Sequence, residues 1–365
     1  MDKARITEML QQLTAADGPA GEETRVAALV QALAEPYASQ THVDALGNVI
    51  ALRRGTRGAE EPARRIMLAA HMDEIGLIVT HVEDGFLSVH RVGGVDPRSL
   101  LGQEVTVYPT GPGAEAYPDG LPGYIGSRPP HVLSESDRSK AVTLADVRVD
   151  LGKPADFFAG GLVRIGDRIA MRGPYTELLA GRAATKALDD RACVAAMLGA
   201  LGYLADMRHT WDVYAVATVQ EEIGIRGATT SAFGVAPDLA IALDVTFGET
   251  PGIDASKTVA MDKGPAIGWG PNLHPGVVKG LRDAAEALEI PSVTEVIPGH
   301  SGTDAWAIQV SREGIPTGLL SIPIRYMHST VELVATADVD RTARLLAAYI
   351  ARLGRDTLAA LAEEI

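Results

Sequence analysis

The sequence predicts an α/β fold with a mostly parallel sheet, helices on both faces, and a small all-β domain inserted into the chain. Three observations lead to this prediction. Strand-like and helix-like apolar patterns alternate over residues 1–74 and again over residues 171–365, as in folds where helices connect parallel strands. Residues 75–170 contain short β-like runs separated by glycine and proline. At 365 residues, the chain is longer than one typical domain of about 150 residues.

The segment 1–74 opens with two predicted amphipathic helices. Apolar residues recur at helical spacing over 6–13 and again over 26–33. A β-hairpin with a Gly-Asn turn is expected over 42–53. The apolar run 65–71 predicts a buried strand that ends in a histidine.

The segment 75–170 contains five short β-like runs and no helical periodicity. Stretches rich in glycine and proline separate the runs. One such stretch, residues 111–130, predicts a long exposed loop. The expected strands are 76–82, 86–92, 104–109, 146–151 and 168–172.

The segment 171–365 returns to alternating helices and strands. Segments 1–74 and 171–365 are therefore expected to form one α/β domain, with 75–170 as the insert. Three apolar runs predict buried strands and three longer runs predict helices, the last of them long and amphipathic. The expected strands are 212–220, 238–245 and 317–323, and the expected helices are 188–206, 278–290 and 338–361.

The composition restricts the partners and the location of the protein. The chain has 33 Lys and Arg against 47 Asp and Glu, a net charge of −14, which argues against nucleic acid or an anionic membrane as a partner. The first residues include charged side chains and lack the apolar core of a signal peptide, so we expect a cytoplasmic protein. Cys193 is the only cysteine, which excludes an internal disulfide and a cysteine-rich metal site. Its apolar surroundings place it in the expected core.

Acidic and histidine side chains follow the predicted strands, at the ends where parallel strands place functional groups. So many acids at one sheet edge would repel one another unless cations neutralised them. Imidazole nitrogens and carboxylate oxygens suit two adjacent divalent cations, with one carboxylate bridging them. The candidate residues are His71, Asp73, Asp189, Glu221, Glu222, Asp244 and His328.

Each candidate also has a purely structural explanation. Asp189 could be only a helix N-cap, and a histidine at a strand end is often hydrogen-bonded without binding a metal. The convergence of several strand ends favours the metal site. The signatures of other hydrolases and of nucleotide-binding loops, H-E-x-x-H, G-x-S-x-G and Walker A, are absent from the sequence. The loop at Ser301 lacks the spacing of a nucleophile elbow.

Six segments, in order along the chain, resemble the M42 metallo-aminopeptidases. This resemblance covers nearly the whole chain, including the insert. It implies a cytosolic enzyme with the fold of dinuclear-metal exopeptidases, which removes N-terminal residues from peptides with two metal ions. The segments are AAHMDEIG (69–76), KALDDRACV (186–194), QEEIGIRGA (220–228), LDVT (243–246), GHSGTDAWAIQ (299–309) and IPIRYMHSTVE (322–332).

The resemblance implies a role for each candidate residue. Asp73 would orient His71, and Glu221 would be the general base. A cis peptide bond is also implied between Asp189 and Asp190. The metal ligands would form two groups that share Asp189 as the bridge, namely His71, Asp189 and Asp244 for one metal and Asp189, Glu222 and His328 for the other.

In the implied mechanism, a hydroxide that bridges the metals attacks the peptide carbonyl, and Glu221 returns the proton to the leaving amine. The metals are expected to be zinc or cobalt, with manganese as an alternative. Two other functions stay open. One is a related dinuclear-metal carboxypeptidase or deacylase, and the other is a glycosidase, which an aromatic content of 5% disfavours. A metal-binding scaffold without catalysis is disfavoured because Glu221 has no ligand role.

The resemblance also implies self-association. Inserts of this kind dimerise, and six dimers close into a hollow dodecamer, with a dimer alone as the alternative. The peptide's preferred N-terminal residue stays open, because the family includes acidic, aliphatic and basic specificities. Arg226 and Arg325 are candidate partners for an acidic side chain, although both lie in segments that follow the general family pattern.

Overall fold

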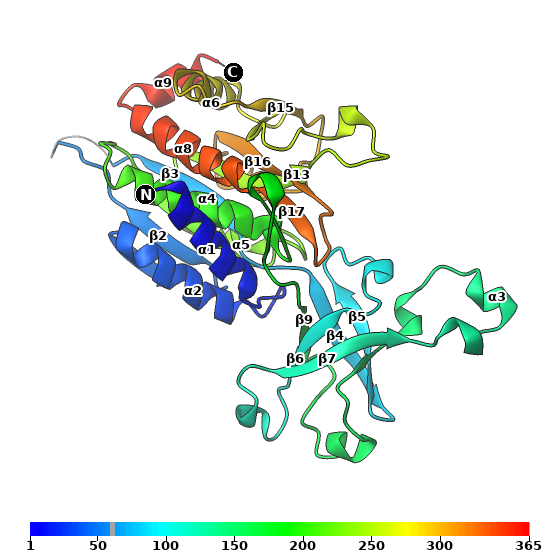
Figure 1. Cartoon of the computed structure of the whole chain (residues 1–365). Coiled ribbons are helices and arrows are strands. Elements are labelled where there is room, and N and C mark those ends of the chain that lie inside the picture. The colour runs from blue at the N-terminus through cyan, green and yellow to red at the C-terminus, as the bar shows by residue number, and fades with distance from the viewer. Residues whose placement is uncertain (59–62, 365) are drawn as a thin grey trace.

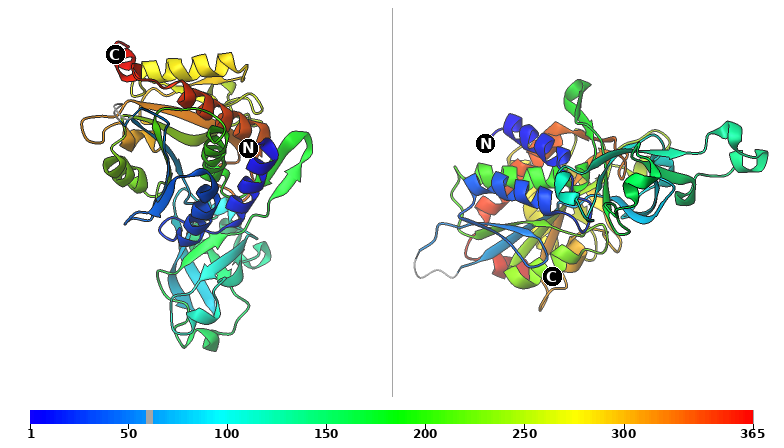
Figure 2. Two further views of the ribbon diagram at one scale, coloured as in Figure 1. Left: turned by 90° about the vertical axis from the view of Figure 1, so that its left-hand side faces the viewer. Right: turned by 90° about the horizontal axis from the view of Figure 1, so that it is seen from below.

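The computed structural model describes residues 1–58 and 63–364, and it shows a mixed α/β protein (Figure 1). One part is a large sheet with helices on both sides, and the other is a six-stranded β-barrel. Two further views show the barrel projecting from one end of the α/β part (Figure 2).

Eleven strands form the large sheet, and four of them make a parallel centre. Nearly every residue of these four strands is buried, as expected for parallel strands that are covered on both faces. In sheet order they are β12 (Asp212–Thr218), β3 (Arg65–His71), β13 (Leu239–Phe247) and β16 (Thr317–Arg325).

The outer strands pair mostly antiparallel, so the prediction of a mostly parallel sheet is right only for the centre. The outer strands are β1 (Gln40–Val43), β2 (Val49–Arg53), β10 (Thr176–Leu178), β11 (Arg182–Thr185), β14 (Ala266–Trp269), β15 (Val293–Val296) and β17 (Glu332–Ala335). Short hairpins join β1 to β2 and β10 to β11, and a short connection can only return the chain antiparallel. Among the outer strands, β14 and β15 form a parallel pair, and β14 pairs antiparallel with β16.

Helices cover both faces of the sheet. They are α1 (Lys3–Ala15), α2 (Thr24–Ala34), α4 (Leu188–Leu204), α5 (Arg226–Val235), α6 (Pro275–Ala287), α7 (Ala305–Ile308), α8 (Thr336–Arg352) and α9 (Thr357–Ala362). One face carries α1, α2, α4 and α8, which pack against one another, and the other face carries α5 and α7. None of the helices within the described ranges is long and apolar enough to span a membrane.

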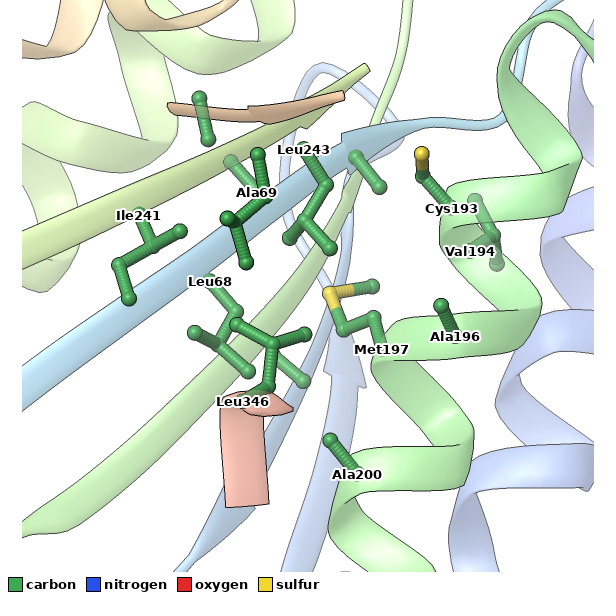
Figure 3. Packing of buried hydrophobic residues seen from close by; sticks show 14 of the residues in the cluster. Leu68, Ala69, Cys193, Val194, Ala196, Met197, Ala200, Ile241, Leu243 and Leu346 are labelled. Carbon is green, nitrogen blue, oxygen red and sulfur yellow. The ribbon is translucent and has the colours of Figure 1, made fainter. Parts of the chain in front are cut away.

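Helix α4 lies between the sheet and the helices α1 and α8, which explains why its sequence is almost entirely apolar after Arg191. Met197 of this helix points toward Leu68 and Leu243 of the central strands (Figure 3). The prediction that Cys193 belongs to the core is confirmed, because its thiol is buried and free.

The prediction of one long C-terminal helix over 338–361 is wrong. The chain forms α8 and α9, with a break at Leu353 and Gly354. The carbonyl groups of these two residues accept hydrogen bonds from Thr210 Oγ1 and Trp211 Nε1, at 2.8 and 3.1 Å. In a continuous helix these carbonyl groups would accept hydrogen bonds from the following turn. Here they accept hydrogen bonds from Thr210 and Trp211 instead.

The six barrel strands all lie within residues 76–171, and they close in the order β4, β5, β8, β7, β6, β9. Their bounds are β4 (Gly76–Glu83), β5 (Phe86–Val92), β6 (Glu104–Tyr108), β7 (Leu121–Ser127), β8 (Val147–Asp150) and β9 (Arg168–Met171). A short helix, α3 (Glu135–Arg138), lies in the excursion between β7 and β8.

Strand β7 corrects the expectation of a loop over 111–130. Leu121, Gly123 and Ile125 are buried on alternate positions of this strand, which is the pattern of a half-buried strand. A Cβ at Gly123 would lie 2.6 Å from Leu151 Cδ2 and 3.0 Å from the Asp150 carbonyl oxygen, so the strand packs closely at this position. The glycine that suggested a loop therefore allows close packing inside the barrel.

A buried ionic cluster joins the barrel to the α/β part. Tyr108 of β6 donates a hydrogen bond to Asp17 Oδ2 at 2.6 Å. The ammonium of Lys186 contacts Asp17 at 2.5 Å and Glu74 at 2.9 Å, and Arg191 reaches Glu74 at 3.3 Å. Within this cluster, the hydrogen bond from Tyr108 to Asp17 is the link between the barrel and the α/β part.

Candidate metal centre

The structure brings five of the predicted residues together at the carboxyl edge of the parallel strands. Their ligand atoms form two groups, and within each group all atoms lie within 4.8 Å of one another. The His71 group consists of His71, Asp189 and Asp244, and the His328 group consists of Asp189, Glu222 and His328.

Asp189 belongs to both groups because each of its carboxylate oxygens faces a different imidazole. His71 Nε2 lies 3.0 Å from Oδ1, and His328 Nε2 lies 3.2 Å from Oδ2. His328 Nε2 also lies 3.3 Å from Glu222 Oε1. This arrangement of imidazole nitrogens around a shared carboxylate is the donor set of a dinuclear divalent-metal site.

Five different elements deliver these side chains. His71 is the last residue of β3, and Asp244 lies in β13. Glu222 follows β12, and His328 follows β16 in a left-handed backbone conformation with φ of +62°. Asp189 lies in the first turn of α4 with non-helical torsion angles, and the Asp189–Asp190 peptide bond is cis.

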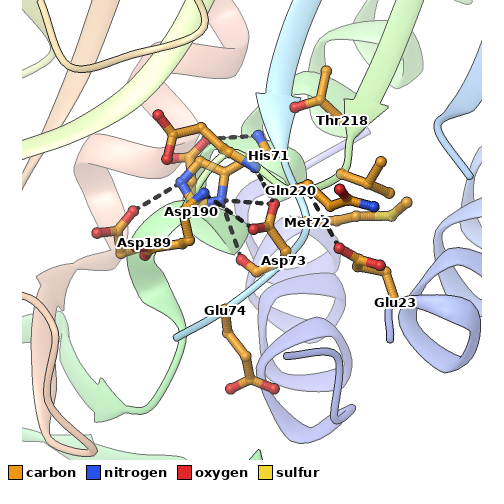
Figure 4. A network of polar contacts seen from close by, with 12 residues as sticks. Glu23, His71, Met72, Asp73, Glu74, Asp189, Asp190, Thr218 and Gln220 are labelled. Atoms are coloured by element: carbon orange, nitrogen blue, oxygen red, sulfur yellow. Dashed lines mark hydrogen bonds and ion pairs between the residues drawn. The ribbon is translucent and has the colours of Figure 1, made fainter. Parts of the chain in front are cut away.

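Asp73 connects His71 to the turn that contains Glu221 and Glu222. Its carboxylate accepts hydrogen bonds from the Glu221 and Glu222 amides at 3.0 and 3.2 Å. His71 Nδ1 lies 3.1 Å from the Asp73 carbonyl oxygen and 3.6 Å from its carboxylate. Figure 4 shows this network of buried polar contacts behind His71. The side chain of Asp73 therefore contacts the glutamate turn, whereas its backbone carbonyl makes the closer contact with His71.

The residue before this turn is held by a carboxylate that the sequence did not single out. Glu23 Oε1 accepts hydrogen bonds from the Gly21 and Gln220 amides, at 2.7 and 3.2 Å (Figure 4). Gln220 has a φ of +57°. Glu23 immediately precedes α2 and lies 197 positions before Gln220 in the sequence, so only the folded structure reveals this contact.

Glu221 lies beside the two groups without belonging to either. Burial raises the pKa of its carboxyl to about 9, and the nearby Asp244, Asp304 and Glu222 contribute to the rise, whereas His71 opposes it. A carboxyl group in such surroundings binds a proton readily, and cations held by the neighbouring groups would bring its pKa down.

The remaining acids show how crowded with negative charge the centre is. Burial raises the pKa of Asp244 well above its usual value, and Asp190 and Asp189 add to this shift. Burial opposes ionisation of Asp189 as well, but hydrogen bonds with His328 and His71 hold its pKa below the usual range. Hydrogen bonds to Asp189 and Glu222 raise the pKa of His328 to about 11. Divalent cations would neutralise this set, so the residues fit a two-metal centre.

The barrel contributes one wall of the centre. A Cβ built on Gly93 would lie 3.0 Å from Glu222 Oε2, and one on Gly94 would lie 2.3 Å from His328 Nδ1. Both glycines follow β5, so the end of a barrel strand contacts the His328 group.

Two further buried carboxylates at the centre were missed by the sequence analysis. Asp304 accepts a hydrogen bond from Thr218 Oγ1 at 2.6 Å, and Glu332 accepts from the Asp189 and His328 amides. Both stand in segments that carry the resemblance, but neither directly follows one of the predicted strands. Arg226 and Arg325 belong to neither ligand group, and Arg325 Nε donates to the Glu249 carbonyl.

The chain is similar to known peptidases over most of its length. The pattern that describes the M42 glutamyl aminopeptidase family matches residues 47–345. The lysyl aminopeptidase of Pyrococcus furiosus is 38% identical over 350 residues, which cover 95% of this chain and 97% of the relative.

Two solved structures are similar over almost the whole chain. An aminopeptidase from the archaeon Desulfurococcus kamchatkensis has a TM-score of 0.88 and 37% identity, with 98% of both chains covered. The TET1 peptidase of Pyrococcus horikoshii has a TM-score of 0.80 and 32% identity, with 95% of this chain and 100% of that chain covered. That peptidase can assemble into a tetrahedron or a large octahedral shell.

Proposed function

This chain belongs to the M42 family of aminopeptidases, and we propose that it removes N-terminal residues from peptides at a two-metal centre around Asp189. The observation that supports this centre is the sharing of one carboxylate by two groups of histidine and acidic ligands. M42 peptidases depend on metals, so the acidic crowding has a functional explanation.

The His71 group would hold one divalent cation and the His328 group the other, with Asp189 as the bridging ligand. Zinc or cobalt suits this mixture of imidazole and carboxylate donors, and manganese is a further candidate. When bound, the two cations supply Lewis-acid chemistry, which lowers the pKa of water and polarises a carbonyl group.

Glu221 is the general base in this proposal. It lies next to both groups, it has no ligand role in either, and its surroundings favour proton uptake. It would take a proton from the attacking water and return it to the amine that leaves. Asp73 would keep Glu221 in place through the hydrogen bond to its amide.

The assembly of the chain is also a proposal. We infer that residues 75–170 form an inserted dimerisation domain and that residues 1–74 with 171–365 form the catalytic domain. Six dimers would then close into a dodecamer, as tetrahedral shells of related peptidases suggest. The cytoplasm is the proposed location, and the single cysteine as a free buried thiol fits a reducing compartment.

One panel of substrates tests the proposed function. The purified protein is stripped with a chelator, reloaded with zinc, cobalt or manganese, and assayed on lysyl, leucyl and glutamyl p-nitroanilides. We expect activity to disappear with the chelator and to return with metal. An N-acetylated peptide should resist cleavage while its free-amine form is shortened by one residue. Equal cleavage of both forms would indicate a deacylase or an endopeptidase instead.

A further inference from the structure

Glu332 is a buried carboxylate that contacts two of the ligand residues through their backbones. Its side chain is 2% exposed. Oε2 accepts a hydrogen bond from the Asp189 amide at 3.1 Å, and Oε1 accepts from the His328 amide at 2.8 Å. Both of its oxygens are therefore used, each by a different ligand of the His328 group.

Pairing of two outer strands brings Glu332 to this position. It is the first residue of β17, and Thr185, the last residue of β11, is its antiparallel partner. Asp189 follows β11 closely in the sequence, and His328 comes shortly before β17. The two ligands thus come from separate segments, 139 positions apart in sequence (328 − 189), and the Glu332 carboxylate is the group that links their peptide planes.

The two amides are the only hydrogen-bond donors to this carboxylate in the described ranges, and no ion pair of Glu332 occurs there. Burying a carboxylate without a cationic partner is costly. Burial indeed raises the pKa of Glu332 well above the usual value, and the charge of Asp189 adds to the rise. Stability of the fold alone gives little reason for an acid here, whereas cations next to Asp189 and His328 would compensate its charge.

We propose that Glu332 is a positioning residue that fixes Asp189 and His328 as a pair and thereby sets the metal affinity of the His328 group. This inference rests on the proposed metal centre. Glu332 holds two of the three ligands of the His328 group but only one ligand of the His71 group. Loss of Glu332 should therefore weaken metal binding by the His328 group more than metal binding by the His71 group. Removal of a residue that orients metal ligands typically costs about 10- to 100-fold in affinity.

The test uses zinc and single-site backgrounds of the full-length protein. Asp244→Asn leaves the His328 group as the intact site, and Glu222→Gln leaves the His71 group. Glu332→Gln is added to each background, and zinc affinity is measured by competition with a chromophoric chelator. We expect an increase in Kd of about 10- to 100-fold for the His328 group and a smaller increase for the His71 group. Glu332→Asp, which keeps the charge but is too short to reach both amides, should act in the same direction.

A matched control separates positioning from general stability. Asp338 is also fully buried. It accepts hydrogen bonds from the Asp262 and Gly264 amides at 2.7 and 3.2 Å and, unlike Glu332, also pairs with Arg341 at 2.9 Å. Asp338→Asn should lower the Tm of the metal-free protein and leave both zinc affinities unchanged. The inference is overturned if Glu332→Gln and Glu332→Asp change the Kd of the His328 group less than threefold, or if Asp338→Asn changes it equally. If wild type binds no zinc and cleaves no aminoacyl substrate, the proposed function itself fails.

Discussion

Gly94 of the barrel approaches His328 so closely that a Cβ at this position would lie 2.3 Å from the imidazole Nδ1. Real Cβ contacts are never this short, so any other residue would displace either the histidine or the end of the barrel strand. The proposed metal centre and the barrel are therefore in direct steric contact, and a change in one should alter the other.

Gly94→Ala should displace His328 and weaken metal binding by the His328 group. We expect one metal to be lost on dialysis and kcat/KM to fall by at least about tenfold, because orientation of a ligand controls both. Gly126→Ala is the matched control, since Gly126 also lies in the barrel, has no positive φ and has open space around it. Wild-type metal content in Gly94→Ala would show that the contact is not required.

Glu221→Gln should retain both metals and lose nearly all turnover. The amide has the shape of the carboxyl but cannot accept a proton, and removal of a general base typically costs about 10²- to 10⁴-fold in rate. Metal content by elemental analysis and kcat are measured on the same preparation. A kcat within a few-fold of wild type would remove Glu221 from the mechanism.

The metal-free protein should become less stable as the pH rises from about 6.5 to 9. Burial raises the pKa of Glu221 from 4.5 to about 9, and hydrogen bonds to Asp189 and Glu222 raise that of His328 from 6.5 to about 11. In this range the folded state binds more protons than the unfolded state, so stability falls with increasing pH.

Thermal unfolding at several pH values measures this dependence. Glu221→Gln should reduce the slope of Tm against pH in the metal-free protein, since it removes one of the groups whose pKa is raised in the folded state. Bound zinc should also flatten the slope, because cations favour the ionised carboxylate. A Tm that rises over the same range would contradict the assigned surroundings of both residues.

Lys186→Met should destabilise the junction between the barrel and the α/β part. The Lys186 side chain is 6% exposed and pairs with Asp17 and Glu74, and breaking a buried ion pair on one side typically costs about 3–5 kcal/mol. Lys279→Met is the control, because its pair with Asp283 is exposed and such pairs contribute about 1 kcal/mol or less. Urea unfolding gives both values, and equal losses would mean that burial of the cluster is unimportant.

The candidate ligand residues could be found from the sequence because several of them lie at or after the ends of parallel strands. His71 and Asp244 lie at or near the ends of buried apolar runs that are easily recognised, and Glu222 follows another. Since neighbouring parallel strands end at the same edge, a rule about strand ends places these three residues together. The division of the candidates into two ligand groups came from the resemblance to the M42 family.

The parts that were missed depend on contacts between distant segments. Glu332 is set beside Asp189 by the pairing of β11 with β17, which the sequence pattern does not indicate. The break after α8 depends on hydrogen bonds from Thr210 and Trp211. The sequence predicts a loop where strand β7 lies because glycines in a strand, such as Gly123 beside Leu151, look in the sequence like those of a turn.

Asp189→Asn provides the most direct test of the account, because one carboxylate is proposed to serve both metals. The measurement is the number of zinc ions retained per chain after dialysis, determined by elemental analysis on wild type and variant. We predict two ions in wild type and the loss of both from Asp189→Asn, because an amide cannot donate two anionic oxygens to two cations. Retention of two tightly bound zinc ions by Asp189→Asn would contradict the shared site.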